Sequence, residues 1–251
     1  MKKILILGNW KANPKTYKEA KKLLKNTEGS IKKSSISYGY TVPDIYFAGL
    51  REEKIKGLLG VQNIGTVEEG AHTGRSTATM YDSVGVDFTL LGHSEVRKEG
   101  ESNHSINEKL EKTLANKMLS VVCVGESERD KDGIYLKYIE DQLKQILINI
   151  KGENCNKLVI AYEPLWAIGA GTAATPEQCF EVVIMIRRTL ATILGIEHAK
   201  KVLVLYGGTV NKQNAVDFII DGSADGLLIG RSSLDEKEFS LIINNIYEAI
   251  R

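Results

Sequence analysis

The sequence predicts an α/β protein: a closed (β/α)8 barrel of eight parallel strands with outer helices, forming one domain over residues 1–251. Two observations support this prediction. Short segments rich in Ile, Val and Leu alternate with charged segments of helical periodicity, and eight of the apolar segments occur along the chain. The length of 251 residues is also typical of a single barrel domain.

The eight apolar runs are the predicted strands. In chain order they are ILILG (4–8), YGYTV (38–42), LLGVQ (58–62), FTLLG (88–92), SVVCVG (120–125), LVIAY (158–162), VLVLYGG (202–208) and GLLIG (226–230). Runs this continuous are typical of parallel strands that are covered on both faces. An open doubly wound sheet would call for GxGxxG after the first strand, but that position reads GNWKAN (8–13), so the barrel is favoured.

The predicted helices lie between the strands and carry apolar residues three to four positions apart. The clearest are TYKEAKKLLKNT (16–27), NHSINEKLEKTLANKM (103–118), YLKYIEDQLKQILINI (135–150), PEQCFEVVIMIRRTLATIL (176–194) and FSLIINNIYEAI (239–250). Thr175 followed by Pro176 predicts a helix start, because Thr is a good N-cap and Pro suits the first helical position. Asn13 followed by Pro14 predicts a second start in the same way.

Composition argues for a small-molecule partner. Lys and Arg number 33 against 32 Asp and Glu, so no excess of positive charge points to nucleic acid or to an anionic membrane. Three cysteines in no metal-binding spacing (Cys123, Cys155 and Cys179) suggest a reduced, cytoplasmic protein. The first apolar run is shorter than the roughly seven residues of a secretory signal, and no run approaches the ~18 residues that cross a bilayer.

Candidate site residues follow the predicted strands, because a barrel builds its site on the loops at the carboxyl ends of its strands. Those with reactive side chains are Asn9, Lys11, Gln62, His93, Glu95, Glu126 and Glu163. The last two strands end in YGGTV and LLIGRSS, which offer mainly backbone N–H groups. Such glycines are often ordinary turn residues, but their occurrence after consecutive strands favours a phosphate site.

A single histidine at a strand end is often just satisfied by hydrogen bonds, and His93 alone would allow that interpretation. Together, however, Lys11, His93 and Glu163 would give the barrel mouth a cation, an imidazole and a carboxylate beside a phosphate site. These groups are suited to moving protons next to a carbonyl. The other histidines, His72, His104 and His198, are expected in loops or facing solvent.

The motifs resemble those of the triosephosphate isomerase family over the whole chain. They are NWKAN (9–13), GAHTG (70–74), LLGHSE (90–95), VCVGE (122–126), AYEPLWAIGAG (161–171), YGGTV (206–210) and ADGLLIG (224–230). The resemblance implies a TIM barrel that interconverts dihydroxyacetone phosphate and D-glyceraldehyde 3-phosphate in glycolysis and gluconeogenesis. It also implies a homodimer with no cofactor and no metal.

The resemblance implies a role for each matched residue. Glu163 would be the base, His93 a neutral electrophile, and Lys11 an electrostatic contact to substrate with Asn9 beside it. Glu95 would be a buried carboxylate that supports the site from behind. The phosphate would be held by Gly169, Thr209, Gly230 and the backbone N–H of Arg231.

Three positions depart from the family pattern. The family usually has Glu where Arg75 stands, after Thr73 and Gly74, and Arg where Val96 stands, so its usual intersubunit ion pair is lost. Because Val96 replaces the family's arginine, Arg75 does not face a second arginine across the interface. The dimer is therefore expected to survive, with Thr73 reaching toward the site of the neighbouring subunit.

The second departure lies after Glu163, where the resemblance implies a mobile lid that begins at Pro164 and Trp166. At the end of this predicted lid, Ala170, Thr172 and Ala173 replace the usual residues of the hinge. The third is Arg231, which replaces a glycine. A side chain is tolerable there because the backbone binds the phosphate, and its guanidinium is expected to point away from the phosphate.

Two other functions compete with the isomerase. Another phosphosugar barrel, such as an epimerase or an indole-forming synthase, would carry metal ligands or further lysines at its strand ends, and none is found. A non-catalytic relative would have lost Glu163, Lys11 or His93, but all three are present.

Overall fold

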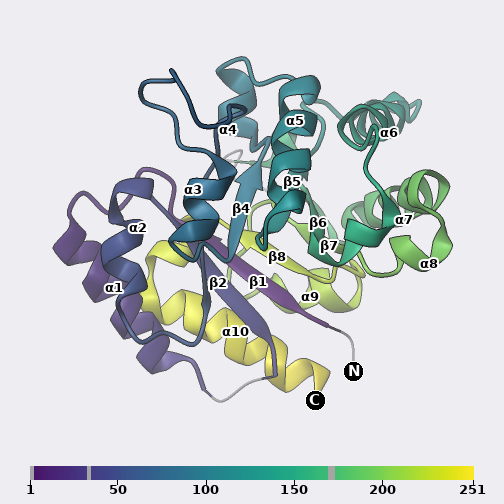
Figure 1. The fold of residues 1–251 in the computed structure, drawn as a ribbon. Coiled ribbons are helices and arrows are strands. Elements are labelled where there is room, and N and C mark those ends of the chain that lie inside the picture. Colours follow the sequence, from purple (N-terminus) through teal and green to yellow (C-terminus); the bar gives the residue numbers. More distant parts are fainter. Residues whose placement is uncertain (1–2, 33–34, 169–172) are drawn as a thin grey trace.

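The computed structural model describes residues 3–32, 35–168 and 173–251. Eight parallel strands pair in sequence order and close into a barrel, with β8 returning to β1 (Figure 1). The strands are β1 (Leu5–Asn9), β2 (Ser37–Val42), β3 (Leu58–Val61), β4 (Phe88–Leu91), β5 (Leu119–Val124), β6 (Leu158–Tyr162), β7 (Leu203–Tyr206) and β8 (Gly226–Ile229). The predicted fold class is confirmed, and every predicted strand overlaps an observed one.

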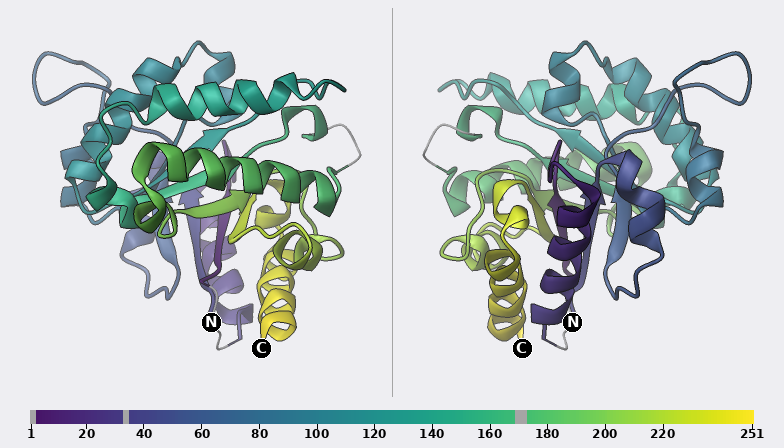
Figure 2. Two further views of the ribbon diagram at one scale, coloured as in Figure 1. Left: turned by 90° about the vertical axis from the view of Figure 1, so that its right-hand side faces the viewer. Right: turned by 90° about the vertical axis from the view of Figure 1, so that its left-hand side faces the viewer.

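Helices surround the barrel, and the two termini lie close together at one end (Figures 1 and 2). The α-helices are α1 (Tyr17–Ser30), α2 (Asp44–Arg51), α3 (Ala78–Ser83), α4 (Ser94–Lys98), α5 (Asn103–Ala115), α6 (Ile134–Ile146), α7 (Pro176–Leu194), α8 (Ile196–Ala199), α9 (Ala215–Ile220) and α10 (Glu236–Ile250). Short 3-10 helices are η1 (Gly152–Lys157), η2 (Leu165–Ala167) and η3 (Arg231–Leu234).

One of the two predicted helix starts is confirmed. Thr175 is the N-cap of α7, with Pro176 at the first helical position and a capping box to Gln178. The start predicted at Asn13 is wrong, because α1 begins at Tyr17. Thr16 caps that helix by accepting the backbone N–H of Glu19, whose side chain reaches back to Thr16 and fixes the start there.

The core has two layers, which explains why the strand sequences are almost continuously apolar. Alternate residues point to opposite faces of a strand, so Leu5 and Leu7 belong to a cluster inside the barrel, together with Phe88 and Val121. Their neighbours, such as Ile6, belong to the larger cluster between the sheet and the helices. Both faces are therefore buried, as the sequence predicts.

Two aspartates brace the end of the barrel opposite the site in the same way. Asp225, just before β8, accepts hydrogen bonds from the backbone N–H of Val204 at 2.9 Å and from Arg187 of α7 at 2.6 Å. Asp87, just before β4, accepts from the backbone N–H of Leu59 and from Arg51 of α2, both at 2.8 Å. Each aspartate therefore ties a strand to the preceding strand and to an outer helix.

We expect Asp225→Ala to lower the free energy of unfolding by about 2–3 kcal/mol, because it leaves a buried N–H and a guanidinium without their acceptor. Asp87→Ala should cost less, since the Asp87 side chain is 26% exposed and the Asp225 side chain 9%. Urea denaturation of both variants measures the difference. Turnover should stay unchanged, because the brace lies far from the barrel mouth, and equal stability of Asp225→Ala and the native chain would contradict the role.

Candidate active site

One cavity of about 730 Å³ opens at the carboxyl ends of the strands. It collects side chains and backbone from the loops that follow β1, β4, β6, β7 and β8. Of the residues predicted for the site, those that line it are Asn9, Lys11, His93, Glu163, Thr209, Gly230 and Arg231. The structure thus brings together residues that lie as far apart as positions 9 and 231.

Glu163 follows β6 directly and is 2% exposed. One oxygen of its carboxylate, Oε1, lies 3.1 Å from Nε2 of His93. The other, Oε2, accepts the backbone N–H of Ser94 at 2.9 Å. The carboxylate and the imidazole are therefore in direct contact at the cavity wall.

One hydrogen bond of the His93 ring favours a particular tautomer of its imidazole. Nδ1 accepts the backbone N–H of Glu95 at 3.3 Å, so this nitrogen carries no proton. The ring proton of a neutral His93 would then be on Nε2, which lies 3.1 Å from Oε1 of Glu163. His93 is the N-cap of α4, and Gly92 before it, with φ of 70°, makes the turn from β4 into that helix.

Burial raises the pKa of Glu163, because the charged carboxylate is removed from water. Contacts with His93 and with the N–H of Ser94 oppose this effect but do not outweigh it. A carboxylate with a raised pKa binds a proton more strongly than one in water, so Glu163 is a better base than an exposed glutamate.

Two glycines flank Glu163 on the neighbouring strands. A Cβ on Gly125, after β5, would lie 1.8 Å from the carbonyl oxygen of Glu163. A Cβ on Gly207, after β7, would lie 3.2 Å from Cγ of Glu163. Sequence reasoning used Gly207 only as a source of backbone amides and gave Gly125 no role, because periodicity does not reveal which side chain a glycine faces.

Lys11 adopts a left-handed conformation with φ of 51°, which is unusual for a residue with a side chain. Its backbone N–H donates to Oδ1 of Asn9 at 2.9 Å, and its carbonyl accepts from Nε2 of Gln62 at 2.8 Å. Gln62, a further strand-end candidate, therefore supports the Lys11 backbone. Such conformations occur mainly where surrounding contacts hold a functional residue in place.

The expectation that Glu95 is buried behind the site is wrong for this chain. Its side chain is 55% exposed, and Oε1 accepts from Nζ of Lys11 at 2.7 Å. Glu95 lies in the first turn of α4, which turns its side chain toward the barrel mouth and the lysine. Lys11 lowers the pKa of Glu95 against a partial desolvation that acts in the opposite direction.

The segment after Glu163 is tied to the barrel in this structure. Oε1 of Glu126 accepts from Tyr162 at 2.9 Å and from Nε1 of Trp166 in η2 at 2.7 Å, and burial raises the pKa of Glu126. The Thr209 hydroxyl donates to the carbonyl of Ala167 at 3.0 Å. Of the predicted lid and its hinge, Gly169, Ala170, Gly171 and Thr172 lie outside the described residues.

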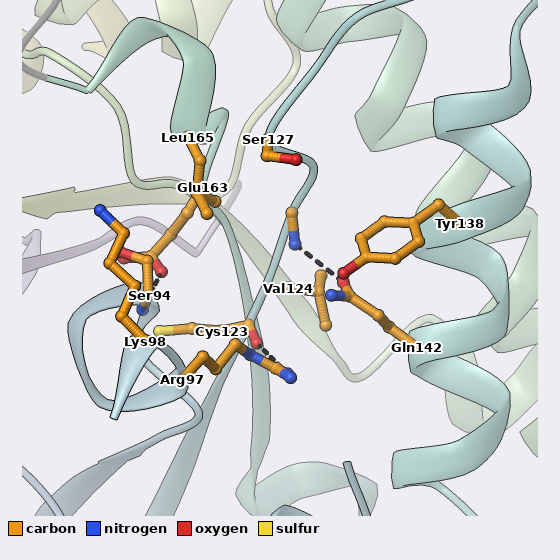
Figure 3. A pocket seen from close by; sticks show the side chains of 11 residues that line it. Ser94, Arg97, Lys98, Cys123, Val124, Ser127, Tyr138, Gln142, Glu163 and Leu165 are labelled. Atoms are coloured by element: carbon orange, nitrogen blue, oxygen red, sulfur yellow. Dashed lines mark hydrogen bonds between the residues drawn. The ribbon is translucent and has the colours of Figure 1, made fainter. Parts of the chain in front are cut away.

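A second cavity of about 170 Å³ lies beside Glu163 (Figure 3). Glu163 also lines the main cavity. The other walls of the second cavity include the buried Cys123, Gln142 and the ring of Tyr138. The Glu163 side chain therefore forms part of the wall between the two spaces. Gln142 accepts the backbone N–H of Gly125 at 2.9 Å and fixes the loop after β5.

Several other predicted residues lie away from the main cavity. Thr73, Gly74 and Arg75 belong to residues 68–76, an exposed stretch of the segment that projects between β3 and α3 (Figure 2). In the part of the chain that is described, none of His72, His104 and His198 lines either cavity. No group of three or more His, Cys, Asp or Glu within the described ranges could hold a metal ion, and no helix there is long and apolar enough to cross a membrane.

The closed parallel barrel carries a carboxylate, an imidazole and a lysine at its mouth, so the chain is a (β/α)8-barrel protein with titratable groups at its candidate site. Comparison with known proteins gives the family. The sequence profile described as "Triosephosphate isomerase" matches residues 4–246, and the chain belongs to the triosephosphate isomerase family.

Relatives from several bacteria carry the same description. A "Triosephosphate isomerase" of Clostridium botulinum (strain Loch Maree / Type A3) is 36% identical over 249 residues, covering 97% of this chain and 100% of the relative. Those of Caldanaerobacter subterraneus subsp. tengcongensis and Delftia acidovorans are each 36% identical, over 251 and 246 residues. They too cover 97% of this chain, with 100% and 98% of their own lengths matched.

Proposed function

We propose that the chain interconverts dihydroxyacetone phosphate and D-glyceraldehyde 3-phosphate through an enediolate intermediate, as a step of glycolysis and gluconeogenesis. Family membership supports this reaction. The observation that supports it most directly is the contact between the buried Glu163 carboxylate and the His93 imidazole at the cavity wall. A base at carbon and a donor at oxygen are the two groups that such an intermediate requires.

In the proposed reaction Glu163 removes a proton from the carbon next to the substrate carbonyl. The developing negative charge on the carbonyl oxygen is stabilised by the Nε2–H of His93 and by the ammonium of Lys11. For the product to form, the hydroxyl proton on the first carbon must also pass to the oxygen of the former carbonyl. His93 is proposed to carry it, by giving its Nε2 proton to that oxygen and taking up the hydroxyl proton. The carboxylic acid of Glu163 then returns its proton to the neighbouring carbon, so both groups are regenerated. Triosephosphate isomerase, with a glutamate base and a neutral histidine, is itself the standard case of pKa values that are set by the surroundings of the catalytic groups.

The phosphate is proposed to bind where the loops after β7 and β8 meet. Thr209, Gly230 and Arg231 line that end of the cavity and offer backbone N–H groups. Gly169 of the lid is proposed to complete the site. Asn9 ends β1 and Lys11 lies on the loop after it, and both would contact the substrate between its phosphate and its carbonyl. Glu95 is proposed to orient the Lys11 ammonium.

A coupled assay tests the proposed function. D-glyceraldehyde 3-phosphate is supplied with glycerol-3-phosphate dehydrogenase and NADH, so the ketose product is reduced as it forms. We expect NADH to be consumed in proportion to the amount of this protein. If no NADH is consumed while the coupling enzyme remains active on dihydroxyacetone phosphate, the proposed function is wrong.

We also propose that the chain acts in the cytoplasm as a homodimer formed through the face around the projecting segment 68–76. Ile45 of α2 is 87% exposed and Met80 of α3 is 50% exposed, which is unusual for apolar side chains of this size. Helices α2 and α3 lie side by side, since Tyr81 donates to Asp44 at 2.7 Å. A second copy of the chain would cover both.

We expect Ile45→Glu to weaken the dimer strongly, because it places a charge in an apolar contact. Arg75→Glu should change association by less than about 1 kcal/mol, since Val96 offers no opposite charge to pair with it. Sedimentation equilibrium at micromolar concentration measures both variants against the native chain. A fully active native monomer at that concentration would contradict the proposed dimer.

A further inference from the structure

Arg231 lines the cavity and has a cationic side chain. The proposed reaction gives a role to its backbone N–H but none to this side chain. Arg231 is the first residue of η3 and lines the 730 Å³ cavity together with Lys11 and Gly230. Its φ is not positive, so the position accepts a side chain without backbone strain. That this side chain points away from the phosphate stays a prediction from the sequence, and the contacts described next favour the opposite.

Lys11 and Arg231 lie at the same end of the cavity. A Cβ on Gly230, the residue before Arg231, would lie 3.6 Å from Cε of Lys11. The ammonium of Lys11, however, is in an ion pair of 2.7 Å with Glu95. Its charge is therefore partly compensated before any substrate arrives, and it attracts an anion less than a free ammonium would.

The Arg231 side chain is exposed and, within the described ranges, has no hydrogen bond or ion pair. Glu238 is the acidic side chain of α10 that lines the same cavity. Its Oε1 lies 3.3 Å from the Ser232 hydroxyl, which donates its one proton mainly to the nearer carbonyl of Val210 at 2.8 Å. The Glu238 carboxylate thus lies against the adjoining loop, and among the described residues it forms no ion pair with Arg231.

We propose that Arg231 binds the phosphate dianion of the substrate through its side chain and so strengthens the binding of the phosphate end of the substrate. The inference rests on the proposed function, because the phosphate must lie at the β7–β8 end of the cavity. A guanidinium presents two parallel N–H donors that match two phosphate oxygens, and its charge persists at any physiological pH. The backbone N–H groups would fix the phosphate position, and Arg231 would add electrostatic attraction.

This role separates binding from chemistry. The reacting carbons would lie beside Glu163 and His93, whereas Arg231 would contact the far, phosphate end of the substrate. Removing the side chain should therefore raise KM and leave kcat nearly unchanged, as expected for binding that is equal in the ground state and in the transition state. Because Arg231 is exposed, the effect should shrink as salt is added.

The experiment compares Arg231→Ala and Arg231→Lys with the native chain, using inorganic phosphate as a competitive inhibitor and the triose phosphate as substrate. We expect Arg231→Ala to raise both the inhibition constant of phosphate and KM by about three- to tenfold at low ionic strength. In 0.5 M salt the two constants of Arg231→Ala should approach those of the native chain, because the Debye length is then only about 4 Å and the charge is screened. Arg231→Lys should recover part of the loss.

Lys212→Ala is the matched control, because it removes the same charge from an exposed position beside the cavity residue Asn211 but not from the cavity wall. It should leave both constants unchanged. If Lys212→Ala has the same effect as Arg231→Ala, or if Arg231→Ala has none, the proposal is wrong. The proposal is also wrong if Arg231→Ala and Glu238→Gln lose the same thermal stability while phosphate inhibition stays unchanged. That result would mean that Arg231 and Glu238 form an ion pair with a structural role.

The two proposals fail in different ways. If the native chain shows no turnover of triose phosphates, the proposed function fails, whatever the variants do. If the native chain turns over and Arg231→Ala keeps the native KM and phosphate inhibition, only the role of Arg231 fails.

Discussion

Glu163→Gln is expected to lower turnover by about a hundred- to ten-thousandfold, the usual contribution of a positioned general base. The amide has nearly the same shape as the carboxylate, and its oxygen can still accept the N–H of Ser94. It cannot accept a proton from carbon, so the loss should appear in kcat. Steady-state kinetics with D-glyceraldehyde 3-phosphate measures it, and a folded variant with more than a tenth of native turnover would exclude Glu163 as the base.

Glu163→Asp separates charge from position. It keeps a carboxylate but draws it back by about one carbon–carbon bond, and a misplacement of ~1 Å can lower the rate about a hundredfold. Inhibition by inorganic phosphate should stay at the native value in both variants, because the phosphate end of the cavity lies on other strands. A parallel loss of phosphate binding would show that the variants disturb the cavity rather than the base.

The pH dependence gives a further check of the same assignment. The base must be ionised to act, and burial raises the pKa of Glu163 above the ordinary value of 4.5. Lowering the pH through the raised pKa should therefore reduce kcat/KM, with a midpoint above 4.5. Unphosphorylated D-glyceraldehyde is the better substrate for this profile, because a phosphate group itself titrates near about 6.

The fold could be predicted from the sequence because parallel strands in a barrel are buried on both faces. Their sequences are then nearly continuous apolar runs, and all eight runs overlap observed strands. The start predicted at Asn13 failed because two N-cap signals lie three residues apart. Only the second, Thr16, also has the glutamate at the third helical position that completes a capping box.

The positions of the site residues at the strand ends could be predicted from the sequence, but the contacts between their side chains could not. Strand ends give the positions of Glu163 and His93, since a barrel brings those ends to one mouth. The exposure of Glu95 could not be read from the sequence, because it depends on an ion pair with Lys11, 84 positions away. The close packing of Gly125 against the backbone carbonyl of Glu163 was missed because it too is a contact between residues far apart in the sequence.

Gly125→Ala is expected to be the most damaging of the small substitutions at the site. The new Cβ would lie 1.8 Å from the Glu163 carbonyl oxygen and 2.7 Å from its carbonyl carbon, and backbone atoms cannot move aside as a flexible side chain can. Two hydrogen bonds hold the loops together here, from Glu163 N–H to the Val124 carbonyl at 2.8 Å and from Leu165 N–H to the Glu126 carbonyl at 3.0 Å.

We therefore expect Gly125→Ala to lower the free energy of unfolding by at least about 3 kcal/mol, and the folded fraction to lose most of its kcat because the base is displaced. Gly29→Ala is the matched control. It lies in the last turn of α1 with no atom within 4 Å of its Cβ, so it should be neutral or stabilise by up to about 1 kcal/mol. Urea denaturation and steady-state kinetics on both variants decide the matter. Native stability and native kcat in Gly125→Ala would mean that the strands move apart easily, and that the position of Glu163 is not set by its contact with β5.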